Sequence, residues 1–322
     1  MPRAKVLVAY DGSTCADAAV RDLQGAGLPT DTECVVLTVA DVWLPPEGSA
    51  DDESVVATLD PLVQARVLAM RQRAKSKVAE AAGIAKRGAH IVNSIFPGWI
   101  VSDEAVADSP GWGILNKADS WPADLVVVGA HGMSAAERIL IGSVSRKVLS
   151  HATCSVRIAR SHSANNYTSP RLVIGFDGSL DADIAVQDVG RRVWPEHTQV
   201  RLVTAVDDTI RTAIAARILK FDRWVTAGQT DDHHVWLSRM AESAAEQLRS
   251  ARLEATCLIT EGEPKRVLLE TAEEWDAHCI FVGATGLRGL HRLLIGSVSS
   301  GVANAAACSV EVVRQRPRLQ QF

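Results

Sequence analysis

One stretch occurs twice in the chain, and this repeat limits what the chain can fold into. Each copy has an apolar run typical of a β-strand, a Gly-x-x-Gly turn, nine further residues and a Gly-Ser pair. The two copies lie 154 residues apart. Their glycines and serines are Gly129, Gly132, Gly142 and Ser143 in the first copy and Gly283, Gly286, Gly296 and Ser297 in the second. A strand that delivers a glycine-rich loop to the start of a helix is a common phosphate cradle.

A second motif is also repeated, at a different spacing. Short apolar runs end in Asp11-Gly12-Ser13 and in Asp177-Gly178-Ser179, which lie 166 residues apart. The first unit therefore carries about a dozen more residues in its middle than the second. Uninterrupted β-branched runs favour strands covered on both faces, as in a parallel sheet. Ser13 and Ser179 are suitable N-caps for the alanine-rich helices that follow.

The remaining pattern predicts the same order of elements in both units. In the first unit we expect strands at 6–10, 34–40, 89–95, 126–129 and 154–159, with a long helix at 61–87. In the second we expect strands at 172–176, 200–206, 254–259, 280–283 and 308–313, with helices at 209–225 and 234–251. This alignment assigns the additional residues of the first unit to 96–109, after its third strand.

Alternation of strands and helices, twice over, predicts an α/β protein with two doubly wound domains. A length of 322 residues suits two domains that each bury a full core. We expect a first domain at 1–160, a turn-rich linker at 161–170, a second domain at 171–315 and a short tail at 316–322. The last strands of the two domains would lie at sheet edges, where they could pair within the chain or across a homodimer.

Composition excludes several classes of partner. The formal net charge of −4 offers no general attraction to nucleic acid or to an anionic membrane surface. No apolar run approaches the roughly 18 residues of a membrane-spanning helix. The six cysteines form no CxxC pair and show no metal-ligand spacing, so buried thiols in a reducing cytoplasm are the expectation. We expect no resident metal site.

The residues around the repeat have the chemistry of an anion site. Glycine at 129 and 132 permits positive φ and a close approach of the backbone to a ligand. Gly142-Ser143 lies where a helix should begin, so unpaired N–H groups and the helix dipole would favour phosphate. A carboxylate at Asp11 could accept hydrogen bonds from ribose hydroxyls or hold a magnesium ion. The competing interpretation is that Asp11 and Asp177 only cap the next helix.

With these motifs in place, the chain resembles the universal stress protein superfamily. The resemblance rests on Gly-x-x-Gly, nine residues and Gly-Ser, together with an opening strand that ends in Asp, and it covers both halves. It implies a tandem member with five-stranded parallel sheets of order 3-2-1-4-5. It also implies ATP over the carboxyl ends of strands one and four, which is the switch point where doubly wound sheets bind ligands.

The resemblance assigns nucleotide-binding roles to matching residues in both units. In the first unit these are Asp11, Val39, Gly129, Gly132, Gly142, Ser143, Val144 and Ser145. In the second they are Asp177, Ala205, Gly283, Gly286, Gly296, Ser297, Val298 and Ser299. Ala205 replaces the valine of the first unit, so the adenine contact is expected to be weaker there. Arg138 and Arg292 occupy matching positions between the glycines. Each could contact a phosphate or simply be a solvated side chain, and the sequence favours neither interpretation.

Other residues in these loops have structural alternatives. His131 corresponds to Thr285, which argues against an obligatory catalytic histidine. Trp121 and Trp275 precede strand four at matching positions and are expected in the core. Trp99 and Trp112 flank the expected insertion, where they could cover a nucleotide or form a partner surface.

These observations favour an ATP-binding regulatory protein with little or no turnover. The chain has a cradle but no Gly-Lys-Ser/Thr, and no base stands at matching places in both halves. Two alternatives remain, namely a scaffold with a structural or empty nucleotide site, and a slow ATPase. An adenylating enzyme is disfavoured because neither a His-x-Gly-His signature nor a Ser-Gly-Gly loop is present.

Overall fold

The computed structural model of the protein describes residues 3–42, 60–131, 141–161, 168–207, 232–286 and 295–315. The first half has strands and helices in strict alternation apart from one short 3-10 turn, η1 (Leu23–Gly25). Its elements are β1 (Lys5–Ala9), α1 (Thr14–Asp22), β2 (Glu33–Ala40), α3 (Pro61–Ile95), β3 (Ile100–Ala107), α4 (Pro110–Ser120), β4 (Leu125–Gly129), α5 (Ser143–His151) and β5 (Ser155–Ala159).

The second half repeats this order. Its elements are β6 (Arg171–Gly175), α6 (Leu180–Arg191), β7 (Gln199–Val206), α8 (Asp232–Ser250), β8 (Glu254–Glu261), α9 (Pro264–Glu274), β9 (Cys279–Gly283), α10 (Ser297–Ala305) and β10 (Ser309–Val313). The expected helix at 209–225 lies outside the described residues.

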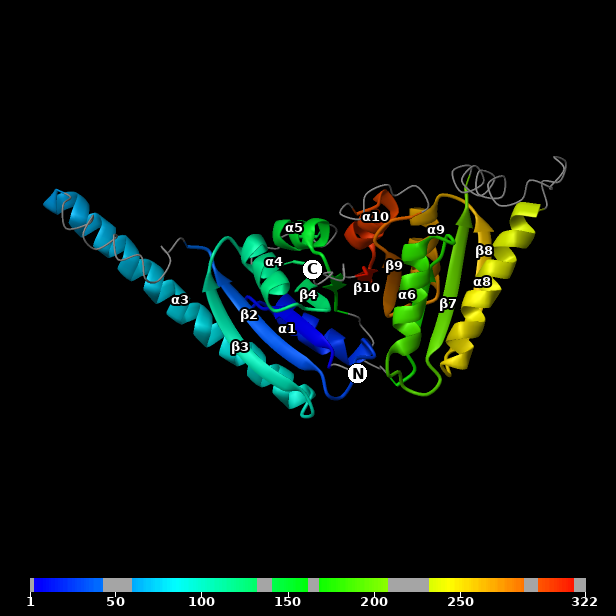
Figure 1. Ribbon diagram of the computed structural model, residues 1–322, viewed down its shortest axis with the longest axis horizontal. Helices are drawn as coiled ribbons and strands as arrows, with labels where there is room; N and C mark the ends of the chain where they lie inside the picture. The colour runs from blue at the N-terminus through cyan, green and yellow to red at the C-terminus, as the bar shows by residue number, and fades with distance from the viewer. Residues whose placement is uncertain are drawn as a thin grey trace, which may run out of the picture.

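All ten strands form one continuous sheet in the order β3-β2-β1-β4-β5-β10-β9-β6-β7-β8. Each half therefore has the predicted order 3-2-1-4-5, and the α/β prediction is confirmed. Strands within a half are parallel, whereas β5 and β10 pair antiparallel at the centre. The last strands are thus paired with each other inside the chain, and β3 and β8 are the outer strands of this sheet (Figure 1).

The third strand of the first half was predicted wrongly. Residues 89–95 belong to the C-terminal end of α3, and the strand is β3, which pairs with β2 over its full length. Buried Ala81, Ala85, Ala89 and Val92 recur at helical spacing and hold this end of α3 on the sheet. Since β3 and β8 lie 154 residues apart, the additional residues of the first half lie between β2 and β3, not in 96–109.

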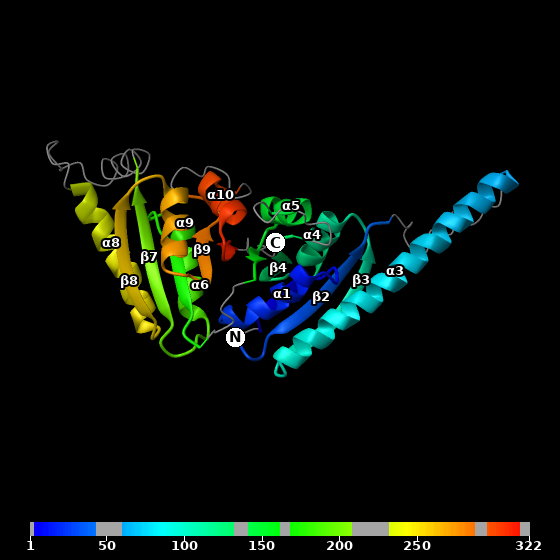
Figure 2. The same ribbon diagram turned by 180° about the vertical axis from the view of Figure 1, so that it is seen from behind.

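Helix α3 is much longer than its counterpart α8. It follows the sheet and then continues beyond it, as both views show (Figure 1 and Figure 2). On the projecting part Leu62 and Met70 are 78% and 69% exposed. None of the described helices is both long and apolar enough to cross a membrane.

The core has one shared part, two large separate parts and a small cluster of Val206 and Leu237. Helices α4, α5, α9 and α10 cover one face of the sheet, and their buried residues form a single cluster that runs through both halves. On the other face α1 and α3 cover the first half, and α6 and α8 cover the second. The first and second halves are therefore joined through one layer of apolar packing as well as through the sheet.

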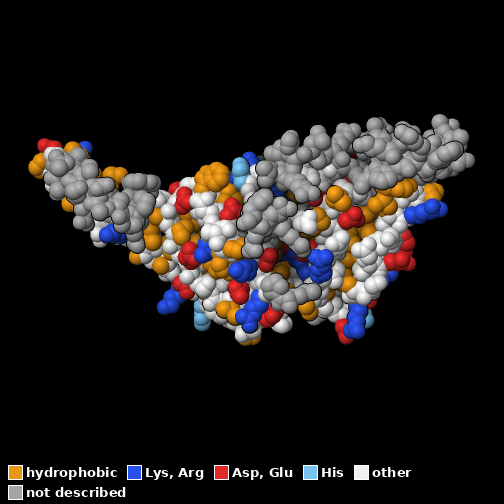
Figure 3. All heavy atoms as spheres, in the orientation of Figure 1, with side chains coloured by type: hydrophobic (Ala, Val, Ile, Leu, Met, Phe, Trp, Pro, Cys, Tyr) orange, Lys and Arg blue, Asp and Glu red, His pale blue; other side chains and the backbone are white. Residues whose placement is uncertain are grey.

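The tryptophans divide between core and surface. Trp121 and Trp275 pack against the shared cluster, as predicted. Trp99 is buried and stacks on Phe96 at 4.1 Å between ring centroids, so it does not cover the predicted site. Trp112 on α4 is 46% exposed. Charged side chains of both signs are interspersed over the described part of the face that Figure 3 shows.

Candidate functional site

The candidate site of each half lies where its first and fourth strands end. After β1, the Oδ1 atom of Asp11 accepts a hydrogen bond from the Ser13 amide at 3.0 Å, and Gly12 adopts φ +78°. The hydroxyl of Ser13 in turn accepts from the Ala16 amide at 3.1 Å and caps α1, as predicted. A positive φ costs glycine nothing, which is why this tight turn can join strand to helix.

The second half repeats this turn and adds a contact with the glycine loop. Asp177 Oδ1 accepts from the Ser179 amide at 2.9 Å, and Gly178 adopts φ +74°. A Cβ atom built on Gly286 would lie 2.7 Å from Asp177 Oδ2. One carboxylate oxygen therefore serves the turn, and the other borders the glycine loop. The aspartate thus stabilises the turn before α6, and the cap of the helix itself is Ser179.

Helix packing requires glycine at position 283 and makes a close approach of the same kind at Gly129. A Cβ on Gly129 would approach the Cys15 carbonyl oxygen to 3.3 Å, and one on Gly283 would lie 2.5 Å from the Asp181 carbonyl carbon. These backbone atoms belong to the first turns of α1 and α6. Gly129 does not use the positive φ that glycine permits, because the described glycines with positive φ are Gly12, Gly27, Gly178 and Gly262.

Helices α5 and α10 begin at the Gly-Ser pairs, as predicted. Their N-caps, Gly142 and Gly296, have no side chain that could accept hydrogen bonds from the first turn. The glycine amides donate to Ala130 and Ala284 carbonyls at 2.8 and 2.7 Å, which holds each helix start against its fourth strand. The amides of the first turn, together with the positive end of the helix dipole, suit an anion. They belong to Ser143, Val144 and Ser145 and to Ser297, Val298 and Ser299.

Two serine hydroxyls of these first turns are already engaged. Ser145 donates to the Gly129 carbonyl oxygen at 2.7 Å, and Ser299 donates to that of Gly283 at 2.6 Å. Both serines are 5% exposed. Their hydroxyl protons thus fix helix to strand in this structure, and only the hydroxyl lone pairs remain to face another group.

The residues expected to contact adenine differ between the halves. Val39 is partly buried, and its Cγ1 atom lies 2.8 Å from a Cβ position on Gly113 of α4. Ala205 is 5% exposed and belongs to the shared core. Gly132, Arg138 and Arg292 lie outside the described residues.

The glycine loop has a side-chain anchor in the second half. Asp181 Oδ2 accepts hydrogen bonds from the Thr285 amide at 2.9 Å and from the Thr285 hydroxyl at 2.5 Å. The first half carries Cys15 and His131 at these two positions. The Nε2 atom of His131 is buried and has no hydrogen-bond partner among the described residues. The two candidate sites are therefore built differently at the loop entrance.

Residues of the second helix of each half also reach the site, and no motif revealed them. Ile84 and Arg87 of α3 lie within 3.3 and 3.7 Å of a Cβ position on Gly12. Trp236 and Met240 of α8 occupy the corresponding place beside Gly178. The first site thus has a cation where the second has an aromatic ring and a thioether. In the described part of the chain, no group of three or more His, Cys, Asp or Glu residues is placed to hold a metal ion.

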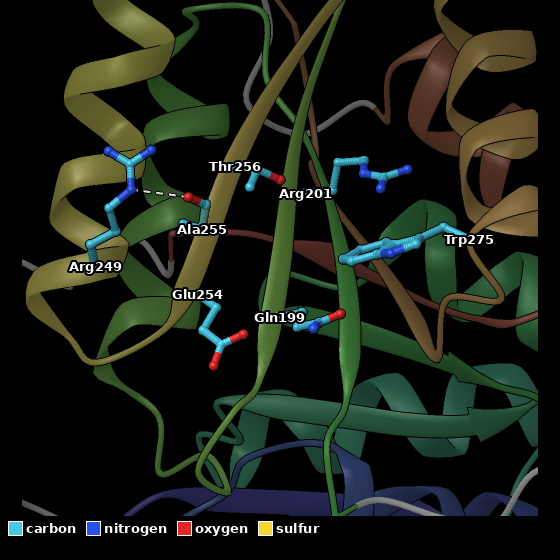
Figure 4. A pocket seen from close by; sticks show the side chains of 7 residues that line it. All are labelled: Gln199, Arg201, Arg249, Glu254, Ala255, Thr256 and Trp275. Carbon is cyan, nitrogen blue, oxygen red and sulfur yellow. Dashed lines mark hydrogen bonds between the residues drawn. The ribbon is translucent and has the colours of Figure 1, made fainter.

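A separate cavity of about 350 Å³ lies at the other end of the second half. Figure 4 shows Gln199 and Glu254, the first residues of β7 and β8, so this cavity is at the amino ends of the strands. Arg201 stacks on Trp275 there, with 4.3 Å between the guanidinium carbon and the ring centroid. Asp177 and Gly286 meet at the carboxyl ends, so the cavity is not part of the candidate site.

Similar proteins fall within one family. The sequence profile of the Universal stress protein family matches residues 2–160 and again residues 169–314. A universal stress protein of Mycolicibacterium smegmatis is 26% identical over 322 residues, which cover 97% of each chain. Universal stress protein Rv2005c of Mycobacterium tuberculosis is 29% identical over 212 residues, which cover 60% of this chain and 62% of that protein.

Solved structures agree on the fold. The crystal structure of a universal stress protein from Archaeoglobus fulgidus DSM 4304 is 19% identical, with a TM-score of 0.59 and 97% of each chain covered. A putative universal stress protein from Pseudomonas aeruginosa UCBPP-PA14 is 16% identical, with a TM-score of 0.56, and the match covers 97% of this chain and 93% of that one. The chain belongs to the universal stress protein family and carries the family's domain twice in tandem.

Proposed function

We propose that this chain holds ATP in two sites, one in each half, and acts as a regulatory protein of the cytoplasm with little or no turnover. One observation carries the proposal. In the second half the aspartate after β6 borders the glycine loop after β9, with Asp177 Oδ2 2.7 Å from a Cβ position on Gly286. This is the switch point of a doubly wound sheet, where such folds bind ligands.

The residues present suit an adenine nucleotide. The first-turn amides of α5 and α10 would hold phosphate oxygens, because a glycine N-cap leaves these donors without a side-chain acceptor. Asp11 and Asp177 would accept hydrogen bonds from ribose hydroxyls, and Val39 and Ala205 would border the adenine. A magnesium ion would arrive with the nucleotide phosphates.

The chain's own residues favour holding the nucleotide over cleaving it. No Gly-Lys-Ser/Thr is present to place a lysine on the β- and γ-phosphates. The polar residue two positions after the first glycine of the loop differs between the halves. It is His131 in the first half and Thr285 in the second. Phosphoryl transfer needs a group that positions the attacking water, and the carboxylates that match between the described parts of the two sites, Asp11 and Asp177, are assigned here to the ribose. Slow hydrolysis with the metal's help is the alternative within this proposal.

Bound nucleotide can be measured directly. Protein purified without added nucleotide is denatured, and the supernatant is analysed for ATP, ADP and AMP. Calorimetry with ATP and magnesium then counts the sites that remain empty. We expect the two measurements to account together for two nucleotides per chain.

A matched variant separates the two sites. Gly286→Ala places a methyl group beside the Asp177 carboxylate and should reduce the count to one. Absence of adenine nucleotide, together with no calorimetric binding, would refute the proposal. Multiple turnover at ordinary enzyme rates that is lost in Asp11→Ala would replace the regulatory role with an enzymatic one.

A second candidate is a scaffold that binds a protein partner. It is favoured by the projecting end of α3, where Leu62, Leu68 and Met70 are 78%, 51% and 69% exposed. Exposed apolar groups of this size often mark interaction surfaces. The central strands no longer support this candidate, because β5 and β10 are paired with each other. Failure of nucleotide binding would make the scaffold the leading function.

A further inference from the structure

The seam between the halves is an approximate twofold contact, and one residue pair of the central strands lies on its axis. Strands β5 and β10 pair antiparallel, with Val310 opposite Ile158 and Glu311 opposite Arg157. Arg157 and Glu311 also occupy the same position in the two repeats, 154 residues apart. Each of them therefore faces its own counterpart, and the two counterparts carry opposite charges.

Away from the axis the contacts are symmetric. The Arg160 amide donates to the Ser309 hydroxyl oxygen at 2.9 Å, and the Arg314 amide donates to that of Ser155 at 3.1 Å. The Arg160 side chain reaches the Ala303 carbonyl of α10, and the Arg314 side chain reaches the Leu149 carbonyl of α5, both at 2.7 Å. These contacts would also form between two copies of one half, so they do not select a partner.

The charges on the axis are asymmetric and buried. Arg157 is 1% exposed and contacts Asp22 at 2.6 Å and Glu311 at 3.1 Å. Glu311, which is fully buried, also accepts hydrogen bonds from Arg192, and Arg192 contacts Asp188 at 2.5 Å. Successive ion pairs of alternating sign, from Asp22 through Arg157, Glu311 and Arg192 to Asp188, thus form one line of charges across the seam. Buried charges of like sign cost several kcal/mol when they are brought together, so this line disfavours other pairings.

Shape adds a second asymmetry. Trp194 of the second half packs on Gly27 of the first, where an added Cβ would lie 2.7 Å from the indole ring. Arg192 Nη1 donates to the Ala26 carbonyl at 2.9 Å in the same contact. At the positions of Ala26 and Gly27 the second half has Arg192 and Val193. Two second halves would therefore drive Val193 into Trp194 and Arg192 towards its own copy.

We propose that this seam is a selective interaction surface whose partner is the unlike half of the same fold. Pairing of two first halves would set Arg157 against Arg157 and would leave the surface at Gly27 without a tryptophan. Pairing of two second halves would set Glu311 against Glu311 and would meet the steric block at Val193. The first half pairs with a strand edge that places a carboxylate opposite Arg157 and a tryptophan beside Gly27. The second half of the same chain provides both.

Cutting the folded chain tests the choice of partner. A protease site is inserted between residues 161 and 168, and the full-length protein is purified and cut. The two pieces are then denatured together, refolded by dilution and analysed by native mass spectrometry at micromolar concentration. We expect pairs of one first half with one second half. Pairs of identical halves, or free halves only, would overturn the proposal.

Two substitutions at one position isolate the axial charge. Glu311→Arg imitates the like-charge arrangement, and Glu311→Gln removes the charge while leaving Asp22 with Arg157 and Asp188 with Arg192. We expect Glu311→Arg to weaken association of the cut halves at least 100-fold, or about 2.7 kcal/mol, and Glu311→Gln to weaken it less than 10-fold. Equal weakening by both variants would show that the axial charge does not select the partner. The refolding experiment on the wild-type halves does not depend on whether Glu311→Arg folds.

Discussion

Arg157→Met should be among the most destabilising single substitutions in this chain. Methionine has a similar length and flexibility, so the substitution removes the charge with little loss of packing. Among the described residues, the carboxylate of Asp22, which is 3% exposed, then retains the Ser309 hydroxyl, 2.7 Å from its other oxygen. Glu311 keeps Arg192. The uncompensated charge is therefore the carboxylate of Asp22, the last residue of α1.

The magnitude follows from leaving one charge buried and unpaired. Removal of one member of a buried pair costs about 3–5 kcal/mol, and we expect a loss in this range. Asp22→Asn in the same chain should recover about 1–3 kcal/mol, because a neutral amide is less costly to bury and can still accept from Ser309. The exposed pair of Lys77 with Glu80 supplies the control, and Lys77→Met should change stability by less than about 0.5 kcal/mol.

Urea denaturation followed by tryptophan fluorescence measures these differences. The chain has eight tryptophans, and the measurement is made at pH 7 on wild type, both single variants, the double variant and the control. A loss below about 1 kcal/mol for Arg157→Met, or a double variant no more stable than the single one, would refute the reasoning. In that case water would screen the charges of the network, and the network would not decide how the two halves pair.

The same network gives the wild-type protein an acid limit. Burial alone would raise the pKa of Glu311, but the charges of Arg192 and Arg157 outweigh burial and hold its pKa below the ordinary 4.5. A lowered pKa means that the folded state favours the ionised carboxylate. This contribution to stability is present above about pH 4.5 and is lost as the pH falls through the lowered pKa. Glu311→Gln should flatten the acid side of the stability profile measured by urea denaturation.

Further predictions concern the site and its supports. Gly283→Ala should destabilise the fold by several kcal/mol in urea. Gly83→Ala, where an added Cβ would meet nothing within 4 Å outside its own helix backbone, should stabilise it by about 1 kcal/mol; equal effects would contradict the packing argument. Asp181→Ala should weaken nucleotide binding to the second site about 10-fold in calorimetry, because the Thr285 amide and hydroxyl lose their acceptor. Unchanged affinity would show that this anchor of the loop does not contribute to binding. Burial and the Asp17 carboxylate raise the pKa of Tyr10 to about 12, so stability should fall as the pH rises from about 10 towards 12; an absorbance titration in which Tyr10→Phe still shows this late step would refute the assignment.

The sequence repeat predicted most of the fold because buried parallel strands leave a strong pattern. The inner strands are mostly apolar, with Arg157 and Glu311 as the charged residues of β5 and β10, and each half has the expected order 3-2-1-4-5. The exception is the outer strand β3, Ile-Val-Ser-Asp-Glu-Ala-Val-Ala, which has three consecutive polar residues and no fully buried one. Residues 89–95 have the stronger β-type composition, yet they continue α3. Burial of an alanine face over several turns outweighed local propensity there.

The site was predicted less completely, because its motif names residues but not their partners. The aspartate turns and the Gly-Ser helix starts lie where the motif implies. The role of Gly283 was missed, because its need for glycine comes from the backbone of α6, some hundred residues earlier in the chain. Arg87 and Trp236 were missed because α3 and α8 carry no pattern related to the ligand. Contacts of this kind depend on how helices cross the sheet, which periodicity does not report.

The position of Arg157 also matters while the protein is being made. Strand β5 leaves the ribosome 154 residues before the strand that will cover it. At roughly 5–20 residues per second, its edge waits about 8–30 s with unpaired backbone groups. During that time Arg157 places a charge in the middle of an otherwise apolar edge, a feature that discourages pairing with neighbouring nascent chains. The arginine that later joins the halves can thus protect the first half before the second exists.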